Sequence, residues 1–170
     1  MAVLHAGTTA TGTVNPNMKS KLLFIVWGAI ALMCSCSTEP SREIRVAEIT
    51  GEVWSSSSPA DVLYENSDSL GLKTIQALIR FRNDFQYDRL DFVVETLTPD
   101  SLIWRDTLSV SYREGAWIET TSLTYTDIKT DYRSQSRLGR TGTYRFRFIP
   151  AMPESYVENV IGAGIEITTL

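Results

Sequence analysis

Histidine and cysteine are almost absent from this 170-residue sequence, which contains one histidine and two cysteines. His5 stands near the start and the cysteines are Cys34 and Cys36, so nothing after Cys36 carries an imidazole or a thiol. That absence removes cysteine nucleophiles, Ser–His–Asp triads, zinc sites built on His or Cys, and haem ligation by either residue. A Gly-rich phosphate-binding loop is also missing from the sequence. We therefore expect a protein that is not an enzyme, with no catalytic residue, no metal site and no cofactor.

Long hydrophobic runs are scarce as well, and the run at Leu22–Met33 is only twelve residues long. As a helix it would span roughly 18 Å, which is less than the ~30 Å hydrocarbon core of a bilayer. It follows Met18 and two lysines, and small residues come after it, a pattern typical of a secretory signal. We place this signal peptide at residues 18–35. Residues 1–17 are interpreted as an extension from a start codon assigned too far upstream.

The signal ends at Cys36, which follows the small residue Ser35, with Met33 two places further back. This arrangement resembles the lipobox of bacterial lipoproteins, whereas Cys34 fits poorly because bulky Met33 precedes it. The resemblance predicts that Cys36 becomes the first residue of the mature chain and carries the lipid. The alternatives are two bystander cysteines, or a Cys34–Cys36 disulfide, which one intervening residue would strain. Residues 36–42 then form a lipidated tether, and residues 43–170 form one domain.

The charge of the mature chain is negative. Removal of Lys19 and Lys21 from the 16 basic residues leaves 14 against 20 acidic ones, a net charge of −6. Nucleic acid is polyanionic and is therefore disfavoured as a partner. The expected contacts are with the membrane, through the N-terminal lipid, and with other proteins of the cell envelope.

Apolar and polar residues alternate with a period of two over most of the chain after Cys36, as in antiparallel strands with one solvated face. Turn signals recur at about ten- to twelve-residue intervals. The pattern predicts an all-β fold, an antiparallel β-sandwich of jelly-roll or Ig-like type. The expected inward faces are Ile75, Ala77, Ile79 and Phe81; Leu90, Phe92 and Val94; Leu108, Val110 and Tyr112; Tyr144, Phe146 and Phe148; and Ile165 with Ile167.

Two segments are interpreted from their length and polarity, because neither shows the period-two alternation. The segment 83–88 between two strand patterns is short, which predicts a β-hairpin. The segment 122–140 is polar, and we interpret it as a loop or a short helix.

Short motifs follow one another along the mature chain in a fixed order, and this order resembles the gliding-motility lipoprotein family GldH of Bacteroidota. The motif residues are Cys36, Trp54 and Asp68; Arg82, Asn83, Phe85, Tyr87 and Leu90; Asp106, Thr107 and Leu108; Gly115 and Trp117; Gly142, Tyr144 and Phe146; and Gly164, Ile165 and Ile167. The resemblance implies an outer-membrane lipoprotein connected with an envelope machinery, and no catalytic step. The alternative function is a carbohydrate- or ligand-binding sandwich, which extends to a carboxylate-dependent glycan hydrolase.

The candidate partner-binding residues are Trp117 with Glu119, and Arg145 with Arg147. Trp117 follows a turn glycine, and the two arginines share a strand face by alternation. Aromatic and arginine side chains are the types that most often anchor protein interfaces. The competing interpretation is that the arginines that cluster in this part of the sequence form a solvated face and pair with nearby acids such as Asp127 and Asp131; they are Arg133, Arg137, Arg140, Arg145 and Arg147.

Carboxylates offer the one remaining route to chemistry or to calcium binding. Four of them lie close in sequence: Asp84, Asp88, Asp91 and Glu95. The simpler interpretation is that the first two are turn residues and the last two line a solvated strand face.

Overall fold

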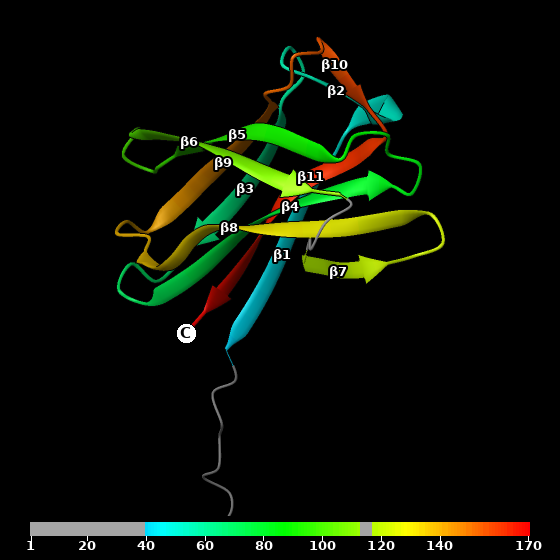
Figure 1. The fold of residues 1–170 in the computed structure, drawn as a ribbon. Helices are drawn as coiled ribbons and strands as arrows, with labels where there is room; N and C mark the ends of the chain where they lie inside the picture. The colour runs from blue at the N-terminus through cyan, green and yellow to red at the C-terminus, as the bar shows by residue number, and fades with distance from the viewer. Residues whose placement is uncertain (1–39, 113–116) are drawn as a thin grey trace, which may run out of the picture. The chain divides into compact units, whose positions relative to one another are not determined.

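The computed structural model describes residues 40–112 and 117–170, with side chains for residues 40–112 and 122–170. The described elements are strands apart from one short 3₁₀ turn, and every strand pairing is antiparallel (Figure 1). Their bounds are β1 (Ser41–Glu48), the turn η1 (Thr50–Glu52), β2 (Val53–Ser55), β3 (Ala60–Asn66), β4 (Leu72–Arg82), β5 (Arg89–Leu97), β6 (Ile103–Ser111), β7 (Trp117–Thr121), β8 (Tyr125–Arg137), β9 (Gly142–Pro150), β10 (Tyr156–Glu158) and β11 (Val160–Thr169).

The strands form two layers. A five-stranded sheet has the order β1-β11-β4-β8-β7, and a four-stranded sheet has the order β3-β9-β5-β6. A short ribbon of β2 and β10 stands at one end, and the first strand begins beside the C-terminus at the other (Figure 1). The rings of Tyr132 and Phe146, from opposite sheets, meet at 6.4 Å between centroids. The predicted antiparallel β-sandwich is confirmed.

The core is built from the faces that the alternation predicts. Phe81, Phe92, Phe146 and Ile165 are each fully buried, and their strand neighbours two positions away are buried with them. Trp54 on β2 is also fully buried and closes the core at the ribbon end. On β6 the predicted face is weaker, because Val110 is buried while Leu108 and Tyr112 are half-buried.

The predicted hairpin at residues 83–88 is wrong. Strand β4 lies in the five-stranded sheet and β5 lies in the four-stranded one, so this connection crosses from one sheet to the other. The reason is Phe85, which is 3 % exposed and stacks on Phe81 at 4.5 Å between centroids. A connection that buries a large ring over the end of the core forms an arch between the sheets rather than a tight turn within one of them.

The expectation of a loop or short helix at residues 122–140 is also wrong, because this segment contains the thirteen-residue strand β8. Its inward side chains include Ile128 and Tyr132, which are buried. Charged side chains of this strand pair across the sheet: Asp127 accepts two hydrogen bonds from Arg80 of β4, at 2.7 and 2.8 Å. Strong non-local pairing therefore stabilises a strand whose composition alone is that of a loop.

Within the described residues, no helix has the length and hydrophobicity needed to cross a membrane. The expected extension at 1–17 and signal peptide at 18–35 lie outside the part of the chain that the structure describes, as does Cys36.

Candidate docking surface

The outer face of the four-stranded sheet carries side chains in rows that run across its strands. In one row, Asp61 of β3 lies opposite Arg147 of β9, which lies opposite Glu95 of β5 and then Arg105 of β6. In the next row, Leu63, Arg145, Leu97 and Ile103 follow one another in the same strand order. We call these the charged row and the mixed row.

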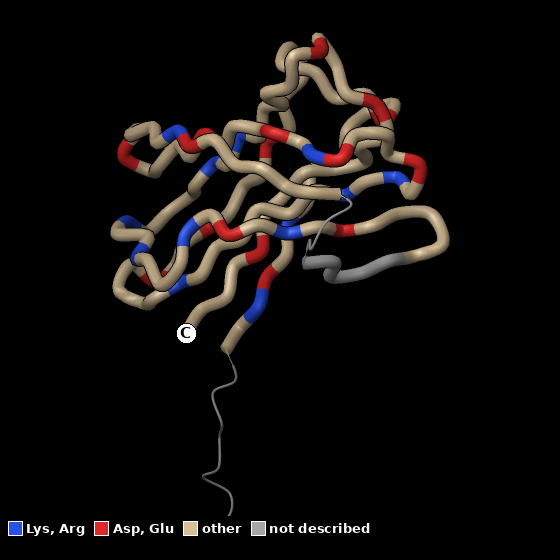
Figure 2. Tube along the Cα trace, viewed as in Figure 1, with Lys and Arg blue, Asp and Glu red and all other residues tan. Residues whose placement is uncertain are grey.

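The charged row is internally neutralised. Arg147 donates to both carboxylate oxygens of Asp61, at 2.8 and 2.9 Å, and Arg105 forms an ion pair with Glu95. The hydrogen bond from Arg147 holds the pKa of the Asp61 carboxyl below its usual range, against the opposing effect of partial burial. This row therefore offers a partner no unpaired charge, and it fixes the guanidinium of Arg147 in one place. Figure 2 shows the same interspersion of basic and acidic positions over the rest of the domain.

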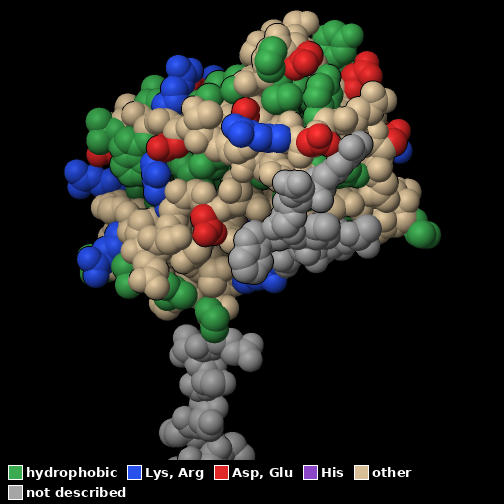
Figure 3. Space-filling view, in the orientation of Figure 1, with side chains coloured by type: hydrophobic (Ala, Val, Ile, Leu, Met, Phe, Trp, Pro, Cys, Tyr) green, Lys and Arg blue, Asp and Glu red, His purple; other side chains and the backbone are tan. Residues whose placement is uncertain are grey.

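The mixed row is different, because its arginine interacts with Asp61 of the charged row only through the attraction of their charges, without a salt bridge. Arg145 has no hydrogen bond or ion pair with any residue that the structure describes. Its row neighbours Leu63 and Ile103 are 61 % and 66 % exposed. Arg145 lines a small hollow of about 80 Å³ together with Leu97 and Ile103 of its own row and Glu95 and Arg147 of the charged row. Figure 3 shows hydrophobic side chains beside basic ones at the surface on the side where β5 joins β6.

Such an arrangement suits binding rather than chemistry. An arginine with free donors can bind a carboxylate through two parallel hydrogen bonds, and exposed aliphatic side chains on either side can be buried by the same partner. The mixed row is the strongest candidate for a docking surface among the described side chains.

The structure places the sequence-predicted site residues in three parts of the chain. Arg145 and Arg147 lie on one outer face, as the alternation predicts, and only Arg147 is paired there. Trp117 and Glu119 belong to β7, an edge strand of the other sheet, and their side chains lie outside the described set. Cys36 lies outside the described residues altogether, so its lipidation stays a prediction.

The pairing of the arginines with Asp127 and Asp131 is not found. Asp127 pairs with Arg80, and Asp131 accepts a hydrogen bond from Gln76 at 2.8 Å, both partners belonging to β4. Pairs across a sheet depend on strand register and not on closeness in sequence, so local charge clustering gave the wrong partners.

The four carboxylates that offered a route to chemistry are not brought together. Asp91 accepts from Arg89 at 2.7 Å, and Glu95 is paired with Arg105, both acids lying on the outer face of β5. Asp84 and Asp88 lie in the arch between β4 and β5. Among the described residues, no three His, Cys, Asp or Glu side chains converge in a way that could hold a metal ion.

Sequence reasoning missed the aliphatic members of the mixed row. Leu63 and Leu97 both stand at positions that alternate with buried residues on their strands. Their solvent-facing place in the period-two pattern was therefore visible in the sequence. A large aliphatic side chain at the solvent-facing position of a strand is the pattern to look for, because it has no role in the core.

Several motif residues have structural roles instead of lining the hollow. Arg82 is paired with Glu52, and the side-chain oxygen of Asn83 accepts a hydrogen bond from Thr126 at 2.9 Å. The Asp68 carboxylate accepts from the main-chain N–H groups of the residues two and three further on, at 2.9 and 3.0 Å, which closes the turn before β4.

The motif residue Asp106 pairs with Arg133 and so joins β6 of one sheet to β8 of the other. Tyr144 and Phe146 are buried, and Gly142 ahead of them has a φ of +116°. These residues hold the two sheets together and shape their ends.

The described part of the chain is an antiparallel β-sandwich whose four-stranded sheet carries aliphatic and arginine side chains on its outer face. The chain belongs to the GldH lipoprotein family, whose family model matches residues 45–167. That match covers nearly the whole sandwich. Comparison with curated proteins finds no significant match.

Family membership identifies the protein as a GldH-type lipoprotein, which belongs to the cell envelope as a membrane-anchored protein. The GldH lipoprotein family is not a known enzyme family.

Proposed function

We propose that the protein is a lipid-anchored component of the outer membrane that docks other envelope proteins without catalysing a reaction. The anchor is the lipid on Cys36, and the docking surface is the mixed row. The observation that carries this proposal is Arg145, whose guanidinium makes no hydrogen bond or salt bridge in the described chain and is set between the exposed side chains of Leu63 and Ile103.

The partner that fits this surface presents a carboxylate flanked by apolar groups. The carboxylate would take both donors of Arg145, and the apolar groups would cover Leu63, Leu97 and Ile103. The charged row beside it is already neutralised, so it contributes shape and polarity at the rim rather than a second attraction.

The test is site-specific photo-crosslinking in the native envelope. A photoreactive residue at position 63 or 103 is expected to crosslink to one defined partner protein, and Arg145→Ala in the same chain is expected to abolish that crosslink. The control position for the crosslinker is Leu123, which is 99 % exposed and lies away from both rows. The control for the charge change is Arg140→Ala, because Arg140 is an exposed arginine that is already paired with Asp100.

Crosslinks that are equally strong from position 123, or that survive Arg145→Ala while Arg140→Ala removes them, would contradict docking through the mixed row. Thermal unfolding of each variant shows whether the sandwich is intact. Because the substituted side chains are exposed, the variants are expected to unfold at nearly the same temperature as the parent.

A further inference from the structure

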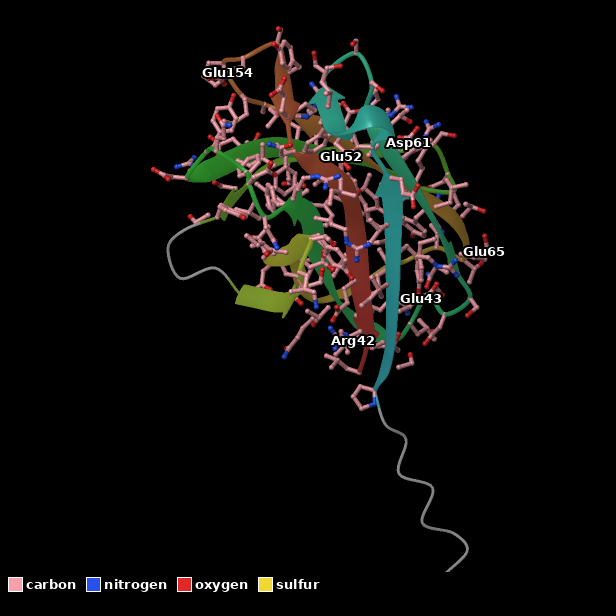
Figure 4. All side chains as sticks on the ribbon, turned by 90° about the vertical axis from the view of Figure 1, so that its right-hand side faces the viewer. Arg42, Glu43, Glu52, Asp61, Glu65 and Glu154 are labelled. Atoms are coloured by element: carbon pink, nitrogen blue, oxygen red, sulfur yellow. The ribbon has the colours of Figure 1, made fainter. Side chains whose placement is uncertain are left out.

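A second hollow, of about 370 Å³, lies at the end of the sandwich that carries the β2–β10 ribbon. It is formed where the arch between β4 and β5 approaches the segment 153–159. Its described lining contains two tyrosines, two carboxylates, two side-chain amides and one serine: Tyr87 and Tyr156, Glu154 and Glu158, Gln86 and Asn159, and Ser155. Figure 4 labels Glu154 at this end of the domain, at the upper left, and Asp61 of the charged row at the right.

The two sides of this hollow are held by different parts of the fold. Tyr87 packs on Phe85 at 5.4 Å between ring centroids, and Phe85 in turn stacks on Phe81 in the core. On the opposite side, Tyr156 belongs to β10 and is paired in register with Ser55 of β2. Asn159 joins the two sides, because its carbonyl oxygen accepts from the N–H of Arg82 at 2.9 Å. The hollow is therefore largely pre-formed.

The polar groups that line it are available to a ligand. The side chains of Glu154, Glu158 and Gln86 and the two tyrosine hydroxyls make no hydrogen bond or ion pair within the described part of the chain. Tyr156 is 51 % exposed, so its ring is accessible. The volume lies within the range of about 300–1,000 Å³ that is usual for small-molecule sites.

The chemistry of the lining selects the class of ligand. Two carboxylates and no basic side chain among the described lining residues disfavour an anion such as a phosphate or a uronic acid. The amide of Gln86 both donates and accepts hydrogen bonds, as the hydroxyl groups of a sugar do. An ammonium or guanidinium group only donates, so it would leave the amide N–H groups of Gln86 without an acceptor, which disfavours a cationic ligand. The accessible tyrosine ring offers an apolar face for a C–H surface.

We propose that this hollow binds a neutral sugar unit of an envelope glycan. The ring of Tyr156 packs on the C–H face of the sugar. Glu154 and Glu158 accept hydrogen bonds from its hydroxyl groups, and Gln86 donates and accepts at its rim. This site is separate from the docking surface and does not depend on it.

A wider depression at the turn η1 does not compete for this role. It measures about 590 Å³, but its described lining contains no aromatic side chain, and its Glu52 is already paired with Arg82. It therefore lacks the ring platform, and of its two carboxylates, Glu48 and Glu52, one is already in a salt bridge.

The test is a titration of the full-length protein in detergent, in which binding is measured by calorimetry and by saturation-transfer NMR. The probes are maltotriose and triacetylchitotriose as neutral sugars, trigalacturonate as an anionic sugar, and trilysine as a cation. At least one neutral trisaccharide is expected to bind, trigalacturonate is expected not to bind, and neutral binding should not change between about 0.05 and about 0.5 M salt. Tyr156→Ala should weaken neutral binding by about tenfold, the loss expected for one aromatic contact.

Two further variants make the outcome decisive. Glu158→Gln, which keeps the size of an exposed side chain, should also weaken neutral binding, and Arg145→Ala should leave it unchanged. The proposal is overturned if neither neutral sugar binds at about 10 mM, which corresponds to less than ~3 kcal/mol of affinity. It is equally overturned if trilysine alone binds, in a salt-dependent way, or if Tyr156→Ala and Glu158→Gln bind like the parent. None of these results bears on crosslinking from the mixed row.

Discussion

The carbonyl oxygen of Arg45 occupies the space in which a Cβ atom on Gly164 would stand. The Cα atom of Val46, the register partner of Gly164, is 2.8 Å from the same point. Strand β1 therefore lies against β11 at a distance that only a glycine allows. This explains the glycine of the C-terminal motif; the following motif residues Ile165 and Ile167, on the other face of β11, are buried in the core.

Gly164→Ala is expected to destabilise the domain by about 1–3 kcal/mol, because main chain and not a flexible side chain must move to make room for the methyl group. Urea unfolding measures this free energy. Gly139→Ala is the matched control, since a Cβ at that position meets nothing within 4 Å. Equal stability of the two variants would mean that β1 does not approach β11 closely.

Phe146→Ala is expected to cost about 3–5 kcal/mol of unfolding free energy, since Phe146 is fully buried between the sheets and contacts Tyr132 across them. Leu63→Ala, on the outer face of the same sheet, should cost less than about 0.5 kcal/mol. The two variants are compared by the midpoint of chemical unfolding. A small loss for Phe146→Ala together with a large loss for Leu63→Ala would invert the two faces of the sheet.

Period-two alternation was enough to assign most of these faces from the sequence. Phe92 and Phe146 were placed in the core because each strand that carries them alternates cleanly. What alternation could not show is which strands pair. The local sequence pattern of two strands joined by a short polar segment is the same for a hairpin and for an arch. Here the arch is favoured by the burial of Phe85 against residues such as Tyr112, which is distant in sequence.

The candidate site was predictable to a similar degree. Alternation put Arg145 and Arg147 on one face, but it could not tell the paired arginine from the unpaired one. That difference depends on the register of β9 against β3, which sets Asp61 opposite Arg147 and Leu63 opposite Arg145. Register is fixed by the whole sheet and not by the residues near the site.

Glu166→Leu is expected to cost about 3–5 kcal/mol, far more than Arg42→Leu. Glu166, at 7 % side-chain exposure, accepts from Lys129 of β8 and from Arg42 of β1, so its loss affects two cations, one of them buried. Arg42 has a side chain 46 % exposed, and an exposed ion pair contributes at most about 1 kcal/mol. Chemical unfolding of both variants, with Arg42→Leu as the control, measures the difference. A cost for Arg42→Leu equal to that of Glu166→Leu would refute this order.

Cys36→Ala is expected to prevent processing and to leave an unlipidated precursor, whereas Cys34→Ala should change little. Two or more acyl chains make anchoring effectively permanent, because each buried methylene contributes about 0.8 kcal/mol. Metabolic labelling with a fatty acid and partitioning into detergent are the measurements. A Cys36→Ala protein that still incorporates label and partitions like the parent would show that the lipid is elsewhere.

The Asp61–Arg147 pair should lose its contribution to stability in acid. Hydrogen bonding to Arg147 lowers the pKa of Asp61 in the folded protein, so the unfolded chain binds a proton more readily. The stabilisation is therefore fully present above the unfolded pKa of about 3.9 and is lost as the pH falls through the lower folded value. Because the Asp61 side chain is 37 % exposed, solvent screening keeps the effect below about 1 kcal/mol.

The unfolding free energies of the parent and of Asp61→Asn should differ at pH of about 6 and converge by pH of about 2. Leu63→Ala, which changes no charge, should differ from the parent by the same amount at both pH values, and a parent–Asp61→Asn difference that stays constant with pH would contradict the proposed linkage.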